Sequence, residues 1–468
     1  MGIRAFSIHA HFYQPPRENP LTGLIPVEQS AAPYPNWNER VFAECYRPNA
    51  DLGNYQQVSF NIGPTLFAWM SGHDPHTCAK IIAQDQANLQ RHQVGNAMAQ
   101  SYNHTILPLS TYQDKVTQIY WGIADFTSRF NRLPQGMWLP ETAVDNETLA
   151  VMARLGIQFT ILAPWQACQP GIDPSQPYRV DLPGEQQISV FFYQSELSSR
   201  VSFDTLATIN ADDFARTILF PSFETARAHA NQPQFLLIAS DGELYGHHQP
   251  QRQHFLAHLV DGASSQLGLQ PTYPALWLKE HPARQSVEIQ ERTSWSCHHG
   301  VARWVGTCPC TPGNGDWKFW LRYSFDRLAN DLDQLYLETT QFLVKDPWQL
   351  RNQYIHVLLG QRSLSSLLSE TASRSLTSDE TRRISLLLEA QRQRQRMFTS
   401  CGWFFEDFDR IEPLNNVAYA AQAVRLARQA TGVDLEPQTA RDLQRVSSLR
   451  LQLSADAVFQ SYINASNS

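Results

Sequence analysis

The feature that most constrains the fold of this chain is an alternation of short apolar runs with longer helix-like stretches, from residue 1 to about residue 290. Most of the apolar runs are almost continuous, which is typical of parallel strands buried on both faces. The runs span 3–8, 58–62, 157–162, 188–193, 235–239 and 286–290. The helix-like stretches span 64–71, 76–92, 112–130, 145–155, 210–228 and 251–266. This order predicts an α/β fold, and a closed barrel is favoured because there are at least six strands and neither a G-x-G-x-x-G nor a Walker loop.

The strands stop after about residue 316, and helical periodicity takes over. Apolar residues recur every three or four positions from Trp317 to Leu335, which predicts one buried helix face. Thr377 and Glu380 form a capping box that opens a helix running to Phe398. Two further helices are expected, at about 414–430 and 437–464.

These patterns predict a catalytic barrel over 1–300 and a helical domain over 301–468 that contributes to the cleft. Within the second region, a run of Gln and Arg covers 391–396. We expect this run to form the solvated side of a helix.

Composition narrows the possible partners. The 468 residues carry 37 Lys and Arg against 44 Asp and Glu, a formal net charge of −7. This balance argues against the strong positive field that nucleic acid or an anionic membrane surface requires. No apolar run approaches a membrane helix of roughly 20 residues, and the N-terminus lacks the long apolar core of a secretory signal. Seven cysteines are an odd, low number that fits a reducing compartment, so we expect a cytoplasmic protein.

Unusual polar residues follow the expected strands, which is where parallel α/β folds place their chemistry. The first strand runs into His9 and His11, which face the same side because they lie two residues apart. Glu141 follows a Trp138-Leu-Pro turn. A tryptophan and a carboxylate at the edge of a cleft suit sugar binding and glycosyl transfer.

The segment 235–250 carries the strongest signal. An apolar strand ends at Ser240 and delivers Asp241, Glu243 and His247 within seven residues. Buried carboxylates are costly unless they are paired or used, so this cluster indicates a site. Two carboxylates from different strands, here Glu141 and Asp241, are what glycoside cleavage requires.

The chain resembles glycoside hydrolase family 57, a group of retaining enzymes that act mainly on α-glucans. The resemblance covers about 1–300 and rests on four motifs, in order: His9-x-His11 followed by Gln14-Pro15, Ser59-Phe-Asn-Ile-Gly-Pro-Thr65, Trp138-Leu-Pro-Glu141, and Asp241-Gly-Glu243-Leu-Tyr-Gly-His247. It implies an incomplete (β/α)7 barrel followed by helices. The reaction could be that of an amylase, a debranching enzyme, a branching enzyme or a glucanotransferase.

The resemblance also implies residue roles. Glu141 would be the catalytic nucleophile and Asp241 the general acid/base, with no cofactor and with an oligo- or polysaccharide substrate. The substrate subsite would be lined by His9, His11, Trp138, Glu243 and His247. The chain departs from the family pattern at 95–104, where the usual Glu is missing and we expect His104 to serve instead. It also departs after His11, where two residues precede Gln14.

The junction with the helical region carries Trp295, Cys297, His298, Cys308 and Cys310. Cys and His at such spacing could hold zinc, but the usual paired C-x-x-C knuckles are missing. We therefore expect no metal, and expect Trp295 and His298 to form a wall of the sugar cleft.

Two other functions remain open from the sequence. A metal-dependent polysaccharide deacetylase could use His9, His11 and Asp241 as ligands, but would leave Glu141 without a task. A catalytically silent glycan-binding protein is disfavoured because both carboxylates are present.

Overall fold

The computed structural model describes residues 2–224, 227, 230–448 and 450–465. The chain divides into two compact units, and each is described by itself. The first unit consists of Met1–Gln14, Val27–Ser101 and Phe126–Trp295. The second unit consists of Pro15–Pro26, Tyr102–Asp125 and Ser296–Ser468. Two N-terminal segments thus belong with the helical region, an arrangement that local sequence patterns do not reveal.

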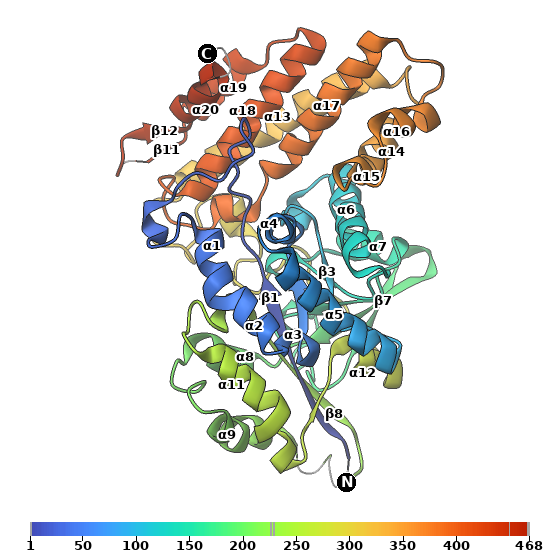
Figure 1. Cartoon of the computed structure of the whole chain (residues 1–468), viewed down its shortest axis with the longest axis vertical. Helices are drawn as coiled ribbons and strands as arrows, with labels where there is room; N and C mark the ends of the chain where they lie inside the picture. Colours follow the sequence, from blue (N-terminus) through green and yellow to red (C-terminus); the bar gives the residue numbers. More distant parts are fainter. Residues whose placement is uncertain (1, 225–226, 228–229, 449, 466–468) are drawn as a thin grey trace. The chain divides into compact units, whose positions relative to one another are not determined.

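The first unit is organised around β1 (Arg4–Phe12). Its neighbours are β2 (Ser59–Ile62) and β8 (Gln234–Asp241), and both pair with it in parallel. Figure 1 shows β1 and β8 running side by side. Almost every residue of the three strands is buried, which explains their continuous apolar sequence.

The other strands of the first unit extend this arrangement. Two further parallel pairs join β3 (Ala99–Gln100) to β4 (Met137–Trp138) and β5 (Phe159–Leu162) to β7 (Gln186–Phe192). The sheet that contains β5 and β7 is extended by β6 (Tyr178–Leu182), which is antiparallel to β7, and then by β10 (Gln285–Ser286), which pairs with β6, so its edge strands are β5 and β10. A short strand, β9 (Gln270–Pro271), adds to β1.

Single links connect these groups of strands. Isolated bridges join Phe60 to Ala97 and Gly136 to Phe159. After β7, the amide of Gln194 donates to the carbonyl of Leu237 in β8 at 2.7 Å. The predicted α/β class is confirmed. The closed barrel stays a prediction, because these links are not continuous ladders.

Helices follow most strands of the first unit; those expected over 64–71, 76–92, 145–155 and 251–266 begin close to the expected positions, whereas those at 195–203 and 274–280 were not expected. They are α4 (Pro64–His73), α5 (Pro75–His92), α7 (Asn146–Arg154), α8 (Ser195–Phe203), α11 (Arg252–His258) and α12 (Pro274–Glu280). The helix expected over 210–228 is instead broken into α9 (Ala211–Phe214), a π-helical turn and a 3-10 turn at Phe220–Ser222. Pro221 lies in this last turn, where it removes a backbone donor. Residues 225–226 and 228–229 of that expected helix lie outside the described residues.

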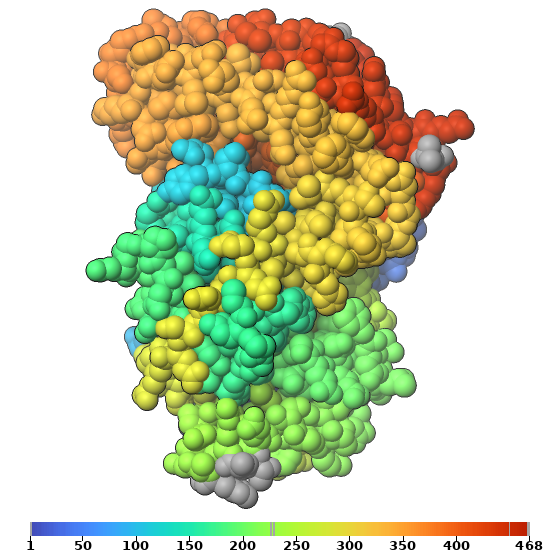
Figure 2. Space-filling view, turned by 180° about the vertical axis from the view of Figure 1, so that it is seen from behind, coloured from blue at the N-terminus to red at the C-terminus, as the bar shows by residue number. Residues whose placement is uncertain are grey.

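The second unit is helical. Its long helices are α13 (Asp316–Thr340), α17 (Ser378–Arg396) and α18 (Ile411–Thr431), and shorter helices include α14 (Pro347–Gln353), α15 (Ile355–Leu358) and α16 (Leu364–Thr371). Most of α6 (Tyr112–Phe130) also belongs here. The capping box of Thr377 and Glu380 is confirmed. Figure 2 shows the C-terminal segments of this unit, coloured orange to red, packed against one another.

The prediction of a single helix over 437–464 is wrong. The chain forms α19 (Glu436–Leu443), a short antiparallel pair of β11 (Ser447–Ser448) and β12 (Leu453–Ser454), and then α20 (Ala455–Asn464). The pair replaces helical hydrogen bonds with bonds between strands. None of the helices in the described part of the chain is long and apolar enough to cross a membrane.

The Gln/Arg run at 391–396 is not solvated, contrary to expectation. Five of its six residues are buried: Gln391, Gln393, Arg394, Gln395 and Arg396. Arg394 forms ion pairs of 2.7 Å with both Asp114 and Asp333. The run therefore forms a buried polar network, because carboxylates distant in sequence neutralise its charge.

Candidate active site

The two histidines lie at the carboxyl end of β1, next to polar residues of both neighbouring strands. In the parallel register, His11 lies opposite Asn61 of β2 and opposite Asp241 of β8. His9 lies opposite Ser59. The strand ends therefore bring residues from three distant parts of the sequence to one place.

His9 is fully buried and both of its ring nitrogens are hydrogen-bonded. Nδ1 lies 2.9 Å from Ser59 Oγ, and Nε2 lies 3.1 Å from Asn61 Oδ1. Burial, together with the neighbouring His11, lowers the pKa of His9 to about 3. Burial also lowers the pKa of His11 to about 4. Both imidazoles are therefore neutral near neutral pH.

Asn61 is the centre of this network, and our sequence reasoning missed it. Its amide nitrogen lies 3.0 Å from His11 Nδ1 and donates to Gln100 Oε1 at 2.7 Å. The residue lay within a motif that resembles the family, but nothing local marked it as part of the site. The signal that could have found it is its place two residues after Ser59 on a strand next to the histidines.

Trp138, at the end of β4, packs against both histidines. Its ring stacks on His9 with centroids 4.7 Å apart and on His11 at 5.1 Å. Trp138 and His9 have no exposed side-chain surface. Their contact with the substrate stays a prediction.

Glu141 lies in a strained turn just after β4. Its φ is 57° and that of Thr142 is 47°, both in the left-handed region that is uncommon for residues with a side chain. Gln166 holds this conformation, because it accepts from the Thr142 hydroxyl at 2.9 Å and donates to the Thr142 carbonyl at 2.8 Å. Strain held in place by hydrogen bonds is a property of functional sites.

Trp295 fixes the carboxylate of Glu141. The indole Nε1 donates to Glu141 Oε2 at 3.1 Å, and the amide of Trp295 donates to the Glu141 carbonyl at 3.0 Å. The indole also packs edge-on against Trp138 at 5.1 Å. Trp295 therefore contacts both Glu141 and Trp138 within the first unit, and its role in a wall of the sugar cleft stays a prediction.

Asp241, the last residue of β8, lies close enough to Glu141 to feel its charge. The residue keeps exposed surface, but protein atoms surround its carboxyl group closely. This burial and the negative charge of Glu141 raise the pKa of Asp241 to about 7. The next residue, Gly242, allows the chain to pass Phe12, because a Cβ there would lie 2.3 Å from the Phe12 ring.

Glu243 and His247 follow Asp241 but make different contacts. Glu243 is buried and its Oε1 accepts from Tyr46 Oη at 2.7 Å and from the amide of Tyr13 at 2.9 Å. Burial is the largest cause that raises the pKa of Glu243, to about 8. His247 Nδ1 forms a hydrogen bond with Glu44 Oε2.

Two of the predicted site residues, His104 and His298, belong to the second unit. His104 is buried there and its Nδ1 lies 2.7 Å from Ser400 Oγ. His298 is exposed. Their participation in the site stays a prediction.

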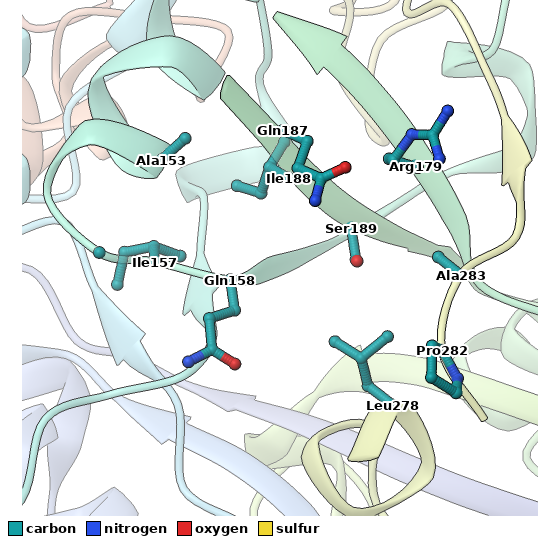
Figure 3. A pocket seen from close by; sticks show the side chains of 11 residues that line it. Ala153, Ile157, Gln158, Arg179, Gln187, Ile188, Ser189, Leu278, Pro282 and Ala283 are labelled. Carbon is teal, nitrogen blue, oxygen red and sulfur yellow. The ribbon is translucent and has the colours of Figure 1, made fainter. Parts of the chain in front are cut away.

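A cavity of about 480 Å³ lies elsewhere in the first unit. It is lined by residues that precede or begin strands, including Gln158 before β5 and Gln187 and Ser189 early in β7 (Figure 3). Glu141 follows β4 and Asp241 is the last residue of β8, so the cavity is at the opposite end of the strands. It is therefore not the candidate active site.

The metal-ligand set of the deacetylase alternative does not fit this geometry. Both ring nitrogens of His9 are already hydrogen-bonded to Ser59 and Asn61. Within the described part of the chain, the side chains that converge as a possible metal site include neither histidine nor Asp241.

Sequence comparison decides the family. Residues 9–289, more than half of the chain, match the profile of glycosyl hydrolase family 57. The chain belongs to glycosyl hydrolase family 57. Residues 314–467 match a second profile, a domain of unknown function called DUF3536. No curated protein matches the sequence significantly.

Solved structures of family 57 enzymes have a similar fold. An exo-type maltose-forming amylase from Pyrococcus sp. ST04 aligns with a TM-score of 0.73 at 15% identity, covering 98% of this chain and 88% of the amylase. A branching enzyme from Pyrococcus horikoshii gives 0.65 at 14% identity, covering 98% and 97%. A branching enzyme from Thermococcus kodakaraensis gives 0.63 at 13% identity, covering 97% and 96%. The similarity of fold extends over the helical region of this family 57 member.

Proposed function

We propose that the protein is a retaining glycoside hydrolase or transglycosylase that acts on α-glucans, with Glu141 as nucleophile and Asp241 as general acid/base. Family membership supports glycoside chemistry. The α-glucan substrate is supported by the maltose-forming amylase and the branching enzymes that share the fold. A cytoplasmic location is part of the proposal, supported by seven cysteines that form no disulfide.

The observation that carries this proposal is the electrostatic coupling of two carboxyl groups. Glu141 contributes to raising the pKa of Asp241 to about 7, so Asp241 can hold a proton at neutral pH. Trp295 donates to the carboxylate of Glu141 and thereby favours its ionised form. One carboxyl is thus prepared to attack and the other to give a proton.

The proposed reaction has two steps. Glu141 forms a bond to the anomeric carbon while the glycosidic bond breaks, and Asp241 gives its proton to the leaving oxygen. Asp241, now ionised, then takes a proton from water or from a sugar hydroxyl, which displaces Glu141. Water yields hydrolysis, and a sugar acceptor yields transfer.

The remaining predicted residues would act around this pair. The predicted substrate-binding side chains of the first unit would contact sugar hydroxyls or ring faces: His9, His11, Trp138, Glu243, His247 and Trp295. Neutral imidazoles both donate and accept hydrogen bonds, as sugar hydroxyls require. His104 and His298, the two predicted residues of the second unit, would also bind the sugar substrate.

The test is the reaction of purified protein with a maltooligosaccharide, followed by proton NMR of the first product. A retaining enzyme releases the α-anomer before mutarotation. Glu141→Gln should abolish activity without loss of folding, and the exposed Glu196→Gln should leave activity unchanged. Initial release of the β-anomer, or near-wild-type activity of Glu141→Gln, would refute the proposal. Product profiles on amylose, glycogen and pullulan would then establish the linkage and the balance of hydrolysis and transfer.

A further inference from the structure

Four potential metal ligands converge in the second unit, in the segment that follows Trp295. They are Cys297, His299, Cys308 and Cys310, and their ligand atoms all lie within 4.8 Å of one another. The Sγ atoms of Cys297 and Cys308 are 3.5 Å apart, and those of Cys297 and Cys310 are 3.7 Å apart. His299 Nδ1 lies 3.3 Å from the Cys310 sulfur and 3.5 Å from the Cys308 sulfur.

These four distances are close to four of the six edges of a ligand tetrahedron around zinc, and the other two pairs of ligand atoms lie within 4.8 Å. Zn–S bonds of about 2.3 Å separate two tetrahedral sulfur ligands by about 3.8 Å. With Zn–N bonds of about 2.0–2.1 Å, the distance from sulfur to nitrogen is about 3.5 Å. The four distances, 3.3 to 3.7 Å, agree with these values to a few tenths of an ångström. A disulfide would instead need a sulfur–sulfur distance of about 2.05 Å.

The local backbone turns the ligands toward each other. The amide of Gly300 donates to the Cys297 carbonyl at 3.1 Å, and the amide of Thr311 donates to the Cys308 carbonyl at 2.9 Å. Each turn follows a buried cysteine. These turns place His299 and Cys310 beside the two buried cysteines. The four ligands therefore converge although their sequence spacing is not C-x-x-C.

A buried lysine lies near these four ligands. Lys318, in α13, has no exposed surface, and its Nζ makes no hydrogen bond among the described residues. It lies close enough to Cys297 and Cys308 for their charges to act on it. A divalent ion with three thiolates and a neutral imidazole carries one net negative charge, which Lys318 would balance.

We propose that Cys297, His299, Cys308 and Cys310 bind one Zn²⁺ ion in a closed structural site. Three sulfur donors and one imidazole in a tetrahedron favour zinc over the hard cations, which take oxygen ligands. Four protein ligands leave no open position for a substrate, so the ion stabilises the chain between Trp295 and α13 and takes no part in glycoside chemistry. This replaces the expectation of no metal, which rested on the missing C-x-x-C spacing.

The experiment measures zinc in the full-length protein, purified without chelators, by inductively coupled plasma mass spectrometry. About one zinc ion per chain is expected, with Cys308→Ser reducing the content to a small fraction of that value. Cys168→Ser is the matched control, because Cys168 is exposed and outside the cluster, and it should keep its zinc. Equal zinc content in both variants would overturn the proposal.

A second measurement uses the unmodified protein, in case Cys308→Ser fails to fold. Cobalt exchanged into the site should give the intense visible bands and the thiolate charge-transfer band of tetrahedral Co²⁺. Protein that holds no zinc and takes up neither metal, or that contains a Cys297–Cys308 disulfide by peptide mass spectrometry, would contradict the site. Neither readout depends on glycosidase activity, so the proposal stands or fails separately from the proposed function.

Discussion

The indole nitrogen of Trp295 donates to Oε2 of Glu141 at 3.1 Å, across 154 positions of sequence. The backbone amide of Trp295 donates to the Glu141 carbonyl at 3.0 Å as well. Glu141 sits at a positive φ, so its turn is costly to maintain without such restraints. Trp295 therefore both orients the proposed nucleophile and favours its ionised form.

Trp295→Phe should reduce turnover while preserving the edge contact with Trp138. A hydrogen bond to a charged group contributes about 1.5–3 kcal/mol, which corresponds to a loss of about 10- to 100-fold in kcat. The acidic limb of the pH–rate profile should move to higher pH, because ionised Glu141 loses a donor. Trp320→Phe, on the partly exposed face of α13, should leave both unchanged. An unchanged acidic limb in Trp295→Phe would show that the indole only fills space.

The pH dependence of activity should follow Asp241. Burial and the charge of Glu141 raise its pKa to about 7, so kcat/KM should fall as the pH rises above that value. The pKa values of His9 and His11, about 3 and about 4, keep both neutral throughout this range. In Glu141→Gln the pKa of Asp241 should decrease, but only partly, since burial is the larger cause. Carbon-13 NMR titration of both proteins measures this directly.

The same group links stability to pH with a definite sign. An aspartate in the unfolded chain ionises at about pH 3.9, whereas Asp241 in the folded protein keeps its proton up to about 7. Between these values the folded state binds more protons, so the free energy of unfolding should fall as the pH rises. Asp241→Asn should flatten this dependence in chemical denaturation between pH 4 and 7. An identical slope in the two proteins would contradict the raised pKa.

Asp241→Asn should also show whether Asp241 acts as the proton donor or has another role. Turnover of a maltooligosaccharide should fall by about 10²- to 10⁴-fold, because the leaving oxygen is no longer protonated. Turnover of α-glucosyl fluoride should fall far less, since fluoride leaves without a proton. Asp51→Asn, which removes an exposed ion pair with Lys80, is the control. Equal losses on both substrates would assign Asp241 a role other than proton donor.

The strand ends could be read from the sequence because their signal is local. Apolar runs at 3–8 and 235–239 end in clusters of polar residues, and β1 and β8 extend through both runs to His11 and Asp241. Asn61 and Tyr46 were missed, since an amide and a phenol become part of a site only through contacts across the sheet.

The second unit contains a segment whose environment could not be predicted from its sequence. The Gln/Arg run at 391–396 has the composition of a solvated helix face, yet the fold buries it. The deciding carboxylates, Asp114 and Asp333, lie on α6 and α13. The composition of a segment predicts whether that segment alone would be solvated. It does not predict which residues distant in sequence will pack against the segment and neutralise its charge. The proposed zinc ligands are a different case, because they lie close in sequence and were discounted only for lacking C-x-x-C spacing.

The buried network makes a final prediction about stability. Burial alone would raise the pKa of Asp114, but the charges of Arg394 and Arg351 lower it to about 2. Arg394→Met removes one partner and leaves Asp114 and Asp333 short of positive charge in a buried site. The free energy of unfolding should therefore decrease by about 3–5 kcal/mol. Urea denaturation at neutral pH, followed by circular dichroism, measures the change.

Arg382→Met is the matched control, since it lies on the same helix and makes an exposed ion pair with Asp379. It should cost less than about 1 kcal/mol, because solvent screens such pairs. The cost of Arg394→Met should shrink as the pH falls toward 2, where Asp114 takes up a proton and no longer needs a cation. If the two variants are equally stable, the guanidinium of Arg394 does not balance buried charge, and the polar interior of α17 must be stabilised by its glutamine hydrogen bonds alone.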